Sequence, residues 1–457
     1  MHNGTDYDVL IVGGGQAGIP LAYKLAGEDR KVALAERKDL GGSCVNFGCS
    51  PTKAAIASAK VAFQARRAAE YGIEIPEVRV DFSAVLRRAR GVAETKRSGL
   101  DRGLEGSDNP VLIRGHARIE GKEEKGFRVQ VGDRSLLVGQ IVLNTGTRTL
   151  IPPIEGLDTV DYIDAGNWLD GKELPGHLVL VGGSYIGLEM AQFYRRMGSE
   201  VTVVVGARDH VTPGEDDDVA EALRDLLARE GIEFVFCERA QSVAPDGDGL
   251  TLKLDGGDPA EVRATHLFLA TGRRPNTDDL GLENVGLKTD SRGFIEVDER
   301  LATDVEGIWA AGDIRGGPMF THTSYDDHRV LLSQMAGDGS RTTDRVVPYA
   351  VFTDPELGRV GMTERAAREA GHDIEVHYLD MEQEKGKAFE LGENKGFIKV
   401  AADAKTDKVL GAAVLTAEGG ELVHIYEDLM NADQPLSVVR EAVYIHPTLA
   451  EDIQSAI

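Results

Sequence analysis

Cysteine, tryptophan and long apolar runs are scarce in this sequence of 457 residues, which contains 3 cysteines and 2 tryptophans. So few cysteines in so long a chain do not form a disulfide-braced scaffold. No run of about eighteen apolar residues occurs, which argues against a membrane-spanning helix. The first residues, 1–8, are polar and lack the pattern of a secretory signal. We therefore expect a cytoplasmic protein.

Positively charged residues are also few: the sequence has 51 lysines and arginines but 76 aspartates and glutamates, which gives a formal net charge of −25. This balance argues against nucleic acid or an anionic membrane as a partner. The acidity fits either a surface adapted to high salt or, more simply, an ordinary acidic enzyme. The acidic run 215–218 is typical of a helix start, where it complements the helix dipole. We expect no resident metal ion.

Two of the three cysteines, Cys44 and Cys49, lie in a glycine-flanked stretch at 41–53. Glycines there let the backbone bend and approach a flat partner closely. Ser50 can cap a helix, so the apolar-rich run 54–71 is predicted to be that helix. Cys49 would then lie at a helix N-terminus, where the dipole and free N–H groups favour a thiolate. This is the setting of a redox-active cysteine.

A dinucleotide-binding pattern precedes that stretch. The apolar strand 7–12 runs into G-x-G-x-x-G, with its glycines at Gly13, Gly15 and Gly18. In a strand–turn–helix unit these glycines form the turn, admit the pyrophosphate and let helix and strand pack. Glu36 ends the next strand, where a carboxylate accepts hydrogen bonds from a ribose.

A second unit of the same kind begins about 170 residues later, with the strand 178–181. Its turn keeps the first and third glycines at Gly182 and Gly187, while Ser184 takes the place of the middle one and narrows the pyrophosphate site. Two such units predict two dinucleotides, one of them a nicotinamide.

The next strand of the second unit, 200–205, ends at Gly206 without a carboxylate. NAD-specific proteins usually place an acid there, whereas an arginine can bind a 2′-phosphate. Arg208 and His210 therefore favour NADPH, and the intervening Asp209 keeps NADH open.

The chain resembles the class I pyridine nucleotide–disulfide oxidoreductases, a flavoprotein family that includes glutathione reductase, dihydrolipoamide dehydrogenase and mercuric reductase. The family's redox motif reads G-G-T-C-x-N-x-G-C-x-P-S-K, and this sequence departs from it only at Ser43 and Thr52. The resemblance covers essentially the whole chain. It implies an α/β fold with two Rossmann-like domains, for FAD and NAD(P), and a C-terminal α+β dimerisation domain.

The resemblance also implies a division of the chain at two crossings between the domains. The first crossing contains Thr145 and Gly146, and the second contains Gly272. The implied parts are the first half of the FAD-binding domain, the NAD(P)-binding domain, the second half of the FAD-binding domain and the interface domain, at 1–150, 151–272, 273–344 and 345–457.

Site residues follow from the same resemblance. Cys44 would exchange with the substrate and Cys49 would contact the flavin. Lys53 and Glu189 would form an ion pair beside the flavin, and Tyr185 would swing aside as the nicotinamide docks. The full set of implied cofactor contacts is Gly13, Gly15, Gly18, Glu36, Gly42, Ser43, Lys53, Thr145, Gly146, Gly182, Tyr185, Gly187, Glu189, Arg208, Gly272 and Asp313.

The C-terminal signature H-P-T-x-x-E is present, with His446 oriented by Glu451. An imidazole can move a proton between thiol and thiolate near neutral pH. In the family this pair reaches the disulfide of the partner subunit, so the resemblance implies a homodimer with a shared active site. Cys237 lies outside every motif and is interpreted as a small buried residue.

The predicted activity is electron transfer from NADPH through FAD and the Cys44–Cys49 disulfide to a small-molecule disulfide. Dihydrolipoamide oxidation with NAD as acceptor is one alternative. A reductase of metal ions, like mercuric reductase, is another, although the end of this chain lacks that enzyme's vicinal cysteine pair. A flavin-binding sensor or scaffold without turnover is the non-enzymatic alternative.

Overall fold

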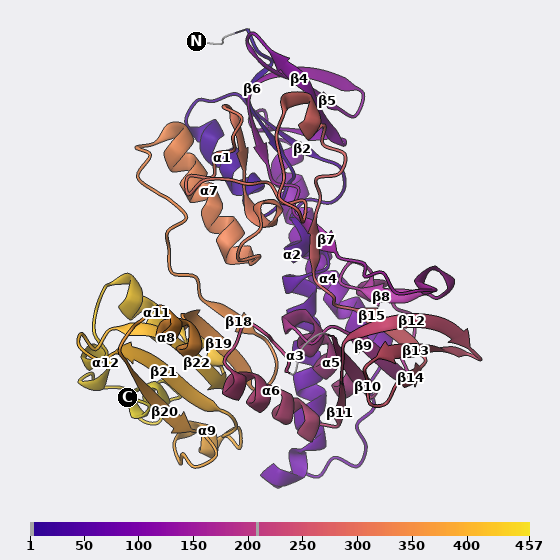
Figure 1. Cartoon of the computed structure of the whole chain (residues 1–457), viewed down its shortest axis with the longest axis vertical. Coiled ribbons are helices and arrows are strands. Elements are labelled where there is room, and N and C mark those ends of the chain that lie inside the picture. The colour runs from indigo at the N-terminus through magenta and orange to yellow at the C-terminus, as the bar shows by residue number, and fades with distance from the viewer. Residues whose placement is uncertain (1–3, 207–209) are drawn as a thin grey trace.

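Three large β-sheets organise the chain, and each carries its own set of helices (Figure 1). The computed structural model describes residues 4–206 and 210–457. Within these ranges, no helix is both long and apolar enough to cross a membrane. The architecture is mixed α/β, as the sequence predicts.

The first sheet has the strand order β3-β2-β1-β6-β5-β4, with β17 added beside β6. Strands β1 and β2 pair in parallel, as do β1 and β6, so β1 has a neighbour on each edge. Its apolar side chains are divided between two buried cores, one on each face of the sheet. Helices α1 and α7 pack against each other beside this sheet (Figure 1). The bounds are β1 (Tyr7–Val12), α1 (Gly18–Gly27), β2 (Val32–Glu36), β3 (Val111–Arg114), β4 (Ala117–Glu123), β5 (Gly126–Val131), β6 (Arg134–Leu143), β17 (Ile308–Ala310) and α7 (Thr321–Ala336).

Two long helices run from the first sheet towards the second (Figure 1). After α2 (Gly42–Asn46), α3 spans Cys49–Arg66 and packs against α4 (Phe82–Glu105). The predicted helix 54–71 thus begins earlier and ends earlier, and a short 3-10 helix, Ala68–Tyr71, follows it. The prediction that Ser50 caps this helix is wrong: Gly48 precedes the first turn, and the Ser50 hydroxyl accepts a hydrogen bond from Lys96 instead.

The second sheet is parallel, with the order β11-β10-β9-β15-β8. Its helix α6 starts in the predicted acidic run. A separate three-stranded antiparallel sheet of β12, β13 and β14 flanks it, and β7 pairs with β16 where the chain crosses between the two larger sheets. The bounds are β7 (Thr147–Thr149), β8 (Tyr162–Asp164), β9 (His177–Val181), α5 (Tyr185–Met197), β10 (Glu200–Gly206), α6 (Asp217–Arg229), β11 (Ile232–Cys237), β12 (Arg239–Asp246), β13 (Gly249–Asp255), β14 (Glu261–Ala264), β15 (His266–Leu269) and β16 (Arg273–Pro275).

The third sheet is antiparallel, with the order β18-β19-β22-β21-β20. Its elements are β18 (Tyr349–Val351), β19 (Glu356–Gly361), α8 (Glu364–Glu369), β20 (Ile374–Asp380), α9 (Lys387–Glu390), β21 (Phe397–Asp403), β22 (Val409–Thr416), α10 (Gly419–Leu422), α11 (His424–Asn431), α12 (Ser437–Arg440) and α13 (Ala450–Ser455). One apolar core joins α3, α4 and α5 to the second sheet and to side chains of the third. The remaining short 3-10 helices lie at Leu157–Thr159, Trp168–Asp170, Leu282–Val285 and Gly312–Arg315.

Candidate active site

The two glycine-rich turns are shaped by their first and third glycines. Gly13 has φ +109°, and a Cβ there would lie 2.3 Å from the carbonyl oxygen of Asn144. In the second turn, Gly182 has φ +125°, and a Cβ on Gly187 would lie 2.0 Å from the Gly182 carbonyl oxygen. Side chains are excluded at these positions, so both turns keep the tight form that a dinucleotide pyrophosphate requires. Ser184, at the middle position of the second turn, is exposed.

Close backbone approach continues next to the first turn. Gly42 has φ +62°, and a Cβ there would lie 3.2 Å from the Cα of Gly15. The carboxylate of Glu36 accepts the backbone N–H of Gly14 at 2.8 Å and that of Lys38 at 2.7 Å. Glu36 is therefore fixed at the end of β2, beside the turn, where the sequence places a ribose-binding acid.

Asn144 supports the first glycine-rich turn, a role that the sequence analysis did not predict. Its buried side chain accepts the backbone N–H of Gly18 at 3.0 Å and donates to the carbonyl of Ala311 at 2.8 Å. It thereby ties the start of α1 to the end of β17. The only signal in the sequence is that the family usually has alanine at this position.

Of the two motif cysteines, Cys44 lies within α2 and Cys49 follows the turn from α2 to α3, and both are free thiols. Cys49 is the first residue of α3, as predicted. The neighbouring thiol of Cys44 is the main cause that lowers the pKa of Cys49 to about 6. The proximity of Cys49, followed by burial, raises the pKa of Cys44. Near neutral pH, Cys49 is thus the thiolate of the pair and Cys44 the thiol.

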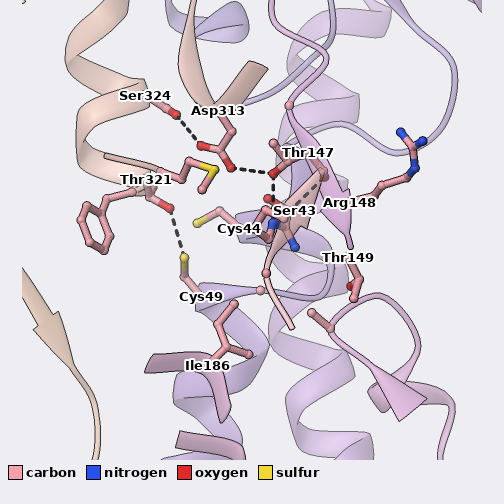
Figure 2. Close-up of a pocket in the computed structure, with 18 of the residues that line it drawn as sticks. Ser43, Cys44, Cys49, Thr147, Arg148, Thr149, Ile186, Asp313, Thr321 and Ser324 are labelled. Atoms are coloured by element: carbon pink, nitrogen blue, oxygen red, sulfur yellow. Dashed lines mark hydrogen bonds between the residues drawn. The ribbon is translucent and has the colours of Figure 1, made fainter. Parts of the chain in front are cut away.

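Helix α7 begins directly beside Cys49 (Figure 2). The Sγ of Cys49 lies 3.1 Å from the hydroxyl oxygen of Thr321, the first residue of α7, and this contact also lowers the pKa of the thiol. The sulfur therefore sits between the N-terminal ends of two helices, where negative charge is stabilised.

Lys53 and Glu189 form the predicted ion pair. The Nζ of Lys53 lies 2.7 Å from Oε2 of Glu189, whose side chain is only 8% exposed. The other carboxylate oxygen accepts the backbone N–H of Phe352 at 3.0 Å, and Lys53 also lies over the ring of Phe352 at 4.3 Å. Lys53 lowers the pKa of Cys49 and Glu189 raises it, so the two members of the ion pair act on this thiol in opposite directions.

A polar chain runs across the cleft from Asp313 (Figure 2). Thr147 donates to Oδ2 of Asp313 at 3.0 Å and accepts from Nε of Arg273 at 2.9 Å, while Ser324 donates to Oδ1 of Asp313 at 3.4 Å. Burial lowers the pKa of Arg273. The sequence singled out Asp313 but not Thr147 or Arg273, which lie far from it in the chain.

The two crossings lie side by side. The hydroxyl of Thr145 donates to the carbonyl of Asn276 at 2.8 Å, and the backbone N–H of Asn276 donates to the carbonyl of Gly146 at 3.0 Å. Gly146 and Gly272 have φ +67° and +116°. Both crossings line the same cleft, which has a volume of about 2140 Å³.

That cleft brings together most of the predicted site residues and exceeds the roughly 300–1,000 Å³ of a pocket for one small ligand. Its lining includes both glycine-rich turns, Cys44, Cys49, Tyr185 and Asp313. Arg208 falls outside the described residues. His210 is engaged elsewhere, with Nε2 3.5 Å from Asp217.

The C-terminal pair is formed but stands apart from the cleft. Nδ1 of His446 lies 3.2 Å from Oε1 of Glu451, and Oε2 of Glu451 accepts the backbone N–H of Thr448 at 2.9 Å. The His446 side chain is 79% exposed. Neither member of the pair is among the described residues that line the cleft with the cysteines.

Comparisons with known proteins agree with this geometry. The pyridine nucleotide-disulphide oxidoreductase family model matches residues 7–327, and the dimerisation domain of the same family matches residues 347–457. The chain is 33% identical to the probable pyridine nucleotide-disulfide oxidoreductase RclA of Escherichia coli, over 98% of each chain. It is 34% identical to the dihydrolipoyl dehydrogenase of Haloferax volcanii, over 99% of this chain and 96% of that one.

Solved structures give the same result. The HOCl-induced flavoprotein disulfide reductase RclA from Escherichia coli superposes with a TM-score of 0.89 at 33% identity, covering 98% of this chain and 99% of that one. A Cu(II) complex of the same protein superposes with a TM-score of 0.88, also at 33% identity, and covers 98% of each chain. The chain therefore belongs to the pyridine nucleotide-disulphide oxidoreductase family, whose members are FAD-dependent enzymes.

Proposed function

We propose that this enzyme reduces a small-molecule disulfide with electrons from NADPH, through FAD and the Cys44–Cys49 pair. The observation that carries the proposal is Cys49: a thiol with its pKa lowered to about 6, at the start of α3, in a cleft between two dinucleotide-type turns. The glycine cradle at Gly13, Gly15 and Gly42 fits a closely approaching pyrophosphate, which supports FAD at the first turn. The domain division expected from the sequence is part of this proposal.

When bound, FAD supplies a ring that takes a hydride from the nicotinamide and passes two electrons to a disulfide. Cys49 would hold the thiolate beside that ring. Cys44, whose raised pKa makes it a poor nucleophile alone, needs a base to attack the substrate disulfide. Cys49 would then resolve the mixed disulfide, which restores the Cys44–Cys49 bond and releases two substrate thiols.

The base would be His446 of the partner subunit, which takes the proton from Cys44 and returns it to the departing thiolate. The exposure of His446 and its separation from the cleft of its own chain support a site shared between two subunits. Glu451 would hold the imidazole in one tautomer through Nδ1. The dimerisation domain of the family covers both residues.

For the nucleotide we propose NADPH rather than NADH, because β10 ends at Gly206 without a carboxylate. In this proposal Tyr185, the first residue of α5, lies at the nicotinamide position and moves aside when the nucleotide docks. Dihydrolipoamide oxidation with NAD runs the same steps in reverse. Because the chain is similar to a dihydrolipoyl dehydrogenase, this reaction is included among the assays below.

A second candidate substrate is Cu(II), which the similar RclA binds in a solved structure. The observation favouring it here is again the thiolate of Cys49, a soft ligand. Two Cu(II) ions would each take one electron from the Cys49 thiolate and the Cys44 thiol, giving two Cu(I), the Cys44–Cys49 disulfide and one proton.

Anaerobic titration of the purified holoprotein with dithionite tests the central claim. A flavin in contact with a redox disulfide stores about four reducing equivalents, whereas a flavin-binding scaffold stores two. Cys49→Ser should abolish the long-wavelength absorbance of the reduced protein, and Cys44→Ser should keep a thiolate on Cys49 but stop turnover. Storage of two equivalents, or normal disulfide reduction by Cys49→Ser, would contradict the proposal.

The substrate is identified by assaying disulfides, dihydrolipoamide and Cu(II) with NADPH and NADH separately. A Cu(I)-specific chelator reports the copper reaction. Preference for NADH in every assay would overturn the choice of nucleotide while leaving the thiol chemistry intact.

A further inference from the structure

A buried carboxylate lies behind the nicotinamide side of the cleft. Glu215 lies next to Asp216, the residue that precedes α6, and has an exposed fraction of 0%. Its Oε1 accepts hydrogen bonds from the hydroxyl of Tyr349, at 2.6 Å, and from the hydroxyl of Tyr185, at 3.3 Å. Oε2 lies 2.8 Å from Nε of Arg359. Glu215 therefore joins Tyr185, a cleft residue at the start of α5, to two residues of the third sheet.

In its hydrogen bonds with the two tyrosines, the Glu215 carboxylate is the acceptor and the phenols are the donors. Burial, followed by the Glu215 charge, raises the pKa of Tyr185 to about 12 and also raises that of Tyr349, so both phenols are neutral donors near pH 7. The contact with Arg359 is ionic rather than an aligned hydrogen bond, because Nε and Oε2 lack a hydrogen-bond partner among the described residues. The aligned bonds of this carboxylate thus go to the two tyrosines.

The tyrosine rings continue as an aromatic row along the cleft. Tyr349 lies between Tyr185, at a centroid distance of 5.4 Å, and Phe320, on which it stacks at 5.2 Å and 10°. Phe320 in turn stacks on His322 at 5.4 Å. All four rings line the cleft. The third sheet therefore supplies part of the wall around Tyr185.

The segment before Glu215 is held in an unusual conformation. Thr212 has φ +44°, which a β-branched residue rarely adopts, and its backbone N–H donates to the carbonyl of Gly183 in the second turn. The backbone N–H of Glu215 donates to the carbonyl of Thr212 at 2.9 Å. A strained backbone persists only where its surroundings fix it, and here it places the carboxylate behind the Tyr185 hydroxyl.

We propose that Glu215 is a positioning residue for Tyr185: its carboxylate, fixed from the third sheet by Tyr349 and Arg359, holds the tyrosine ring over the nicotinamide position and sets how easily the ring moves aside. This inference rests on the proposed function, in which the nucleotide displaces Tyr185. A carboxylate that served only to pair with Arg359 would have no influence on nucleotide binding.

Loosening the hydrogen bond should make displacement of the ring easier, so the nucleotide should bind more tightly. We expect Tyr185→Phe and Glu215→Gln each to lower the dissociation constant of NADP⁺ about three- to tenfold, the range of one modest hydrogen bond. Because both variants break the same bond, the double variant should bind no more tightly than the better single one.

The experiment uses the dimeric holoprotein, with NADP⁺ binding read from the perturbed flavin spectrum and flavin reduction by NADPH read by stopped flow. A structural role alone would change stability but not the balance between the dissociation constant and the limiting reduction rate. Tyr194→Phe is the matched control, since it removes another buried tyrosine hydroxyl from the same helix. The ring of Tyr194 packs against other aromatic rings and not against Glu215. Tyr185→Phe removes one oxygen only, so the test survives if Glu215→Gln fails to fold.

The outcomes separate this inference from the proposed function. Tighter binding in both single variants without additivity supports the positioning role. Unchanged NADP⁺ binding in Tyr185→Phe, or fully additive effects in the double variant, overturns the positioning role of Glu215. The proposed function still stands in that case if NADPH reduces the flavin of the wild-type protein. If the wild-type protein binds neither NADP⁺ nor NAD⁺, both fail together.

Discussion

Lys53 and Glu189 meet at 2.7 Å, and the same carboxylate also receives the backbone N–H of Phe352, so one side chain connects the cysteine helix, the second dinucleotide unit and the start of the third sheet. The pair sits close enough to Cys49 for each member to act on the thiol, with opposite signs. This opposition gives a sharp test.

We expect Lys53→Met to raise the pKa of Cys49 above about 6 and Glu189→Gln to lower it further, each by about one unit. Removing the ammonium takes away charge that favours the thiolate, whereas neutralising the carboxylate takes away charge that opposes it. The pKa is measured from the thiolate–flavin absorbance of the two-electron-reduced holoprotein as pH is varied. Shifts of the same sign in both variants would contradict the assignment.

Thr321 provides a second, independent test of the thiolate. Replacing it with valine removes the hydroxyl that lies 3.1 Å from the Cys49 sulfur, so the pKa of Cys49 should rise and the thiolate–flavin absorbance at pH 6 should fall. Thr321→Ser keeps the hydroxyl and serves as the control, which should titrate like the wild type. An unchanged titration in Thr321→Val would show that the helix dipoles and Lys53 suffice.

Asn144→Ala should weaken both the fold and the retention of flavin. The substitution leaves the backbone N–H of Gly18 and the carbonyl of Ala311 without their buried partner, which costs about 1–3 kcal/mol. Thermal unfolding and the flavin content of the purified protein measure the two effects. Asn284→Ala is the control, because it removes an amide bonded to Ile119 outside the cleft and should leave flavin content unchanged.

Asp452 predicts a pH dependence of stability. Burial, with the charges of Glu384 and Glu451, raises its pKa from 3.8 to about 6. A carboxyl group whose pKa is raised on folding stabilises the fold most below its unfolded value, and this stability is lost as pH rises through about 6. Asp452→Asn, which cannot ionise, should therefore stabilise the protein by about 1–2 kcal/mol at pH 8 and by about half as much at pH 5.

The measurement is the unfolding free energy of both proteins at the two pH values. Equal stabilisation at pH 5 and pH 8 would point to better packing of the amide rather than to a charge left in the core.

The sequence predicted those features that depend on neighbouring residues. The two glycine-rich turns, the acidic start of α6 and the position of Cys49 at a helix N-terminus follow from local patterns, and the structure has all three. Ser50 was wrong as a cap because Gly48 takes the cap position, two residues earlier than expected, with Cys49 itself in the first turn.

The features that local patterns missed join residues far apart in the chain. Thr321 reaches Cys49 across 272 positions and Asn144 reaches Gly18 across 126, and no periodicity marks such pairs. Glu215 was read as one member of an acidic run at a helix start. Its burial against Tyr185, Tyr349 and Arg359 depends on the packing of the second sheet against the third, which a single sequence does not encode locally.

The three-way junction at Glu189 has a practical consequence for dissecting this molecule. A fragment that ends before Phe352, or one that begins after Lys53, strands a carboxylate in an apolar interior without one of its two partners. The properties of a truncated protein would therefore reflect this unpaired buried carboxylate rather than the native domain. Substitutions within the full-length chain avoid this problem.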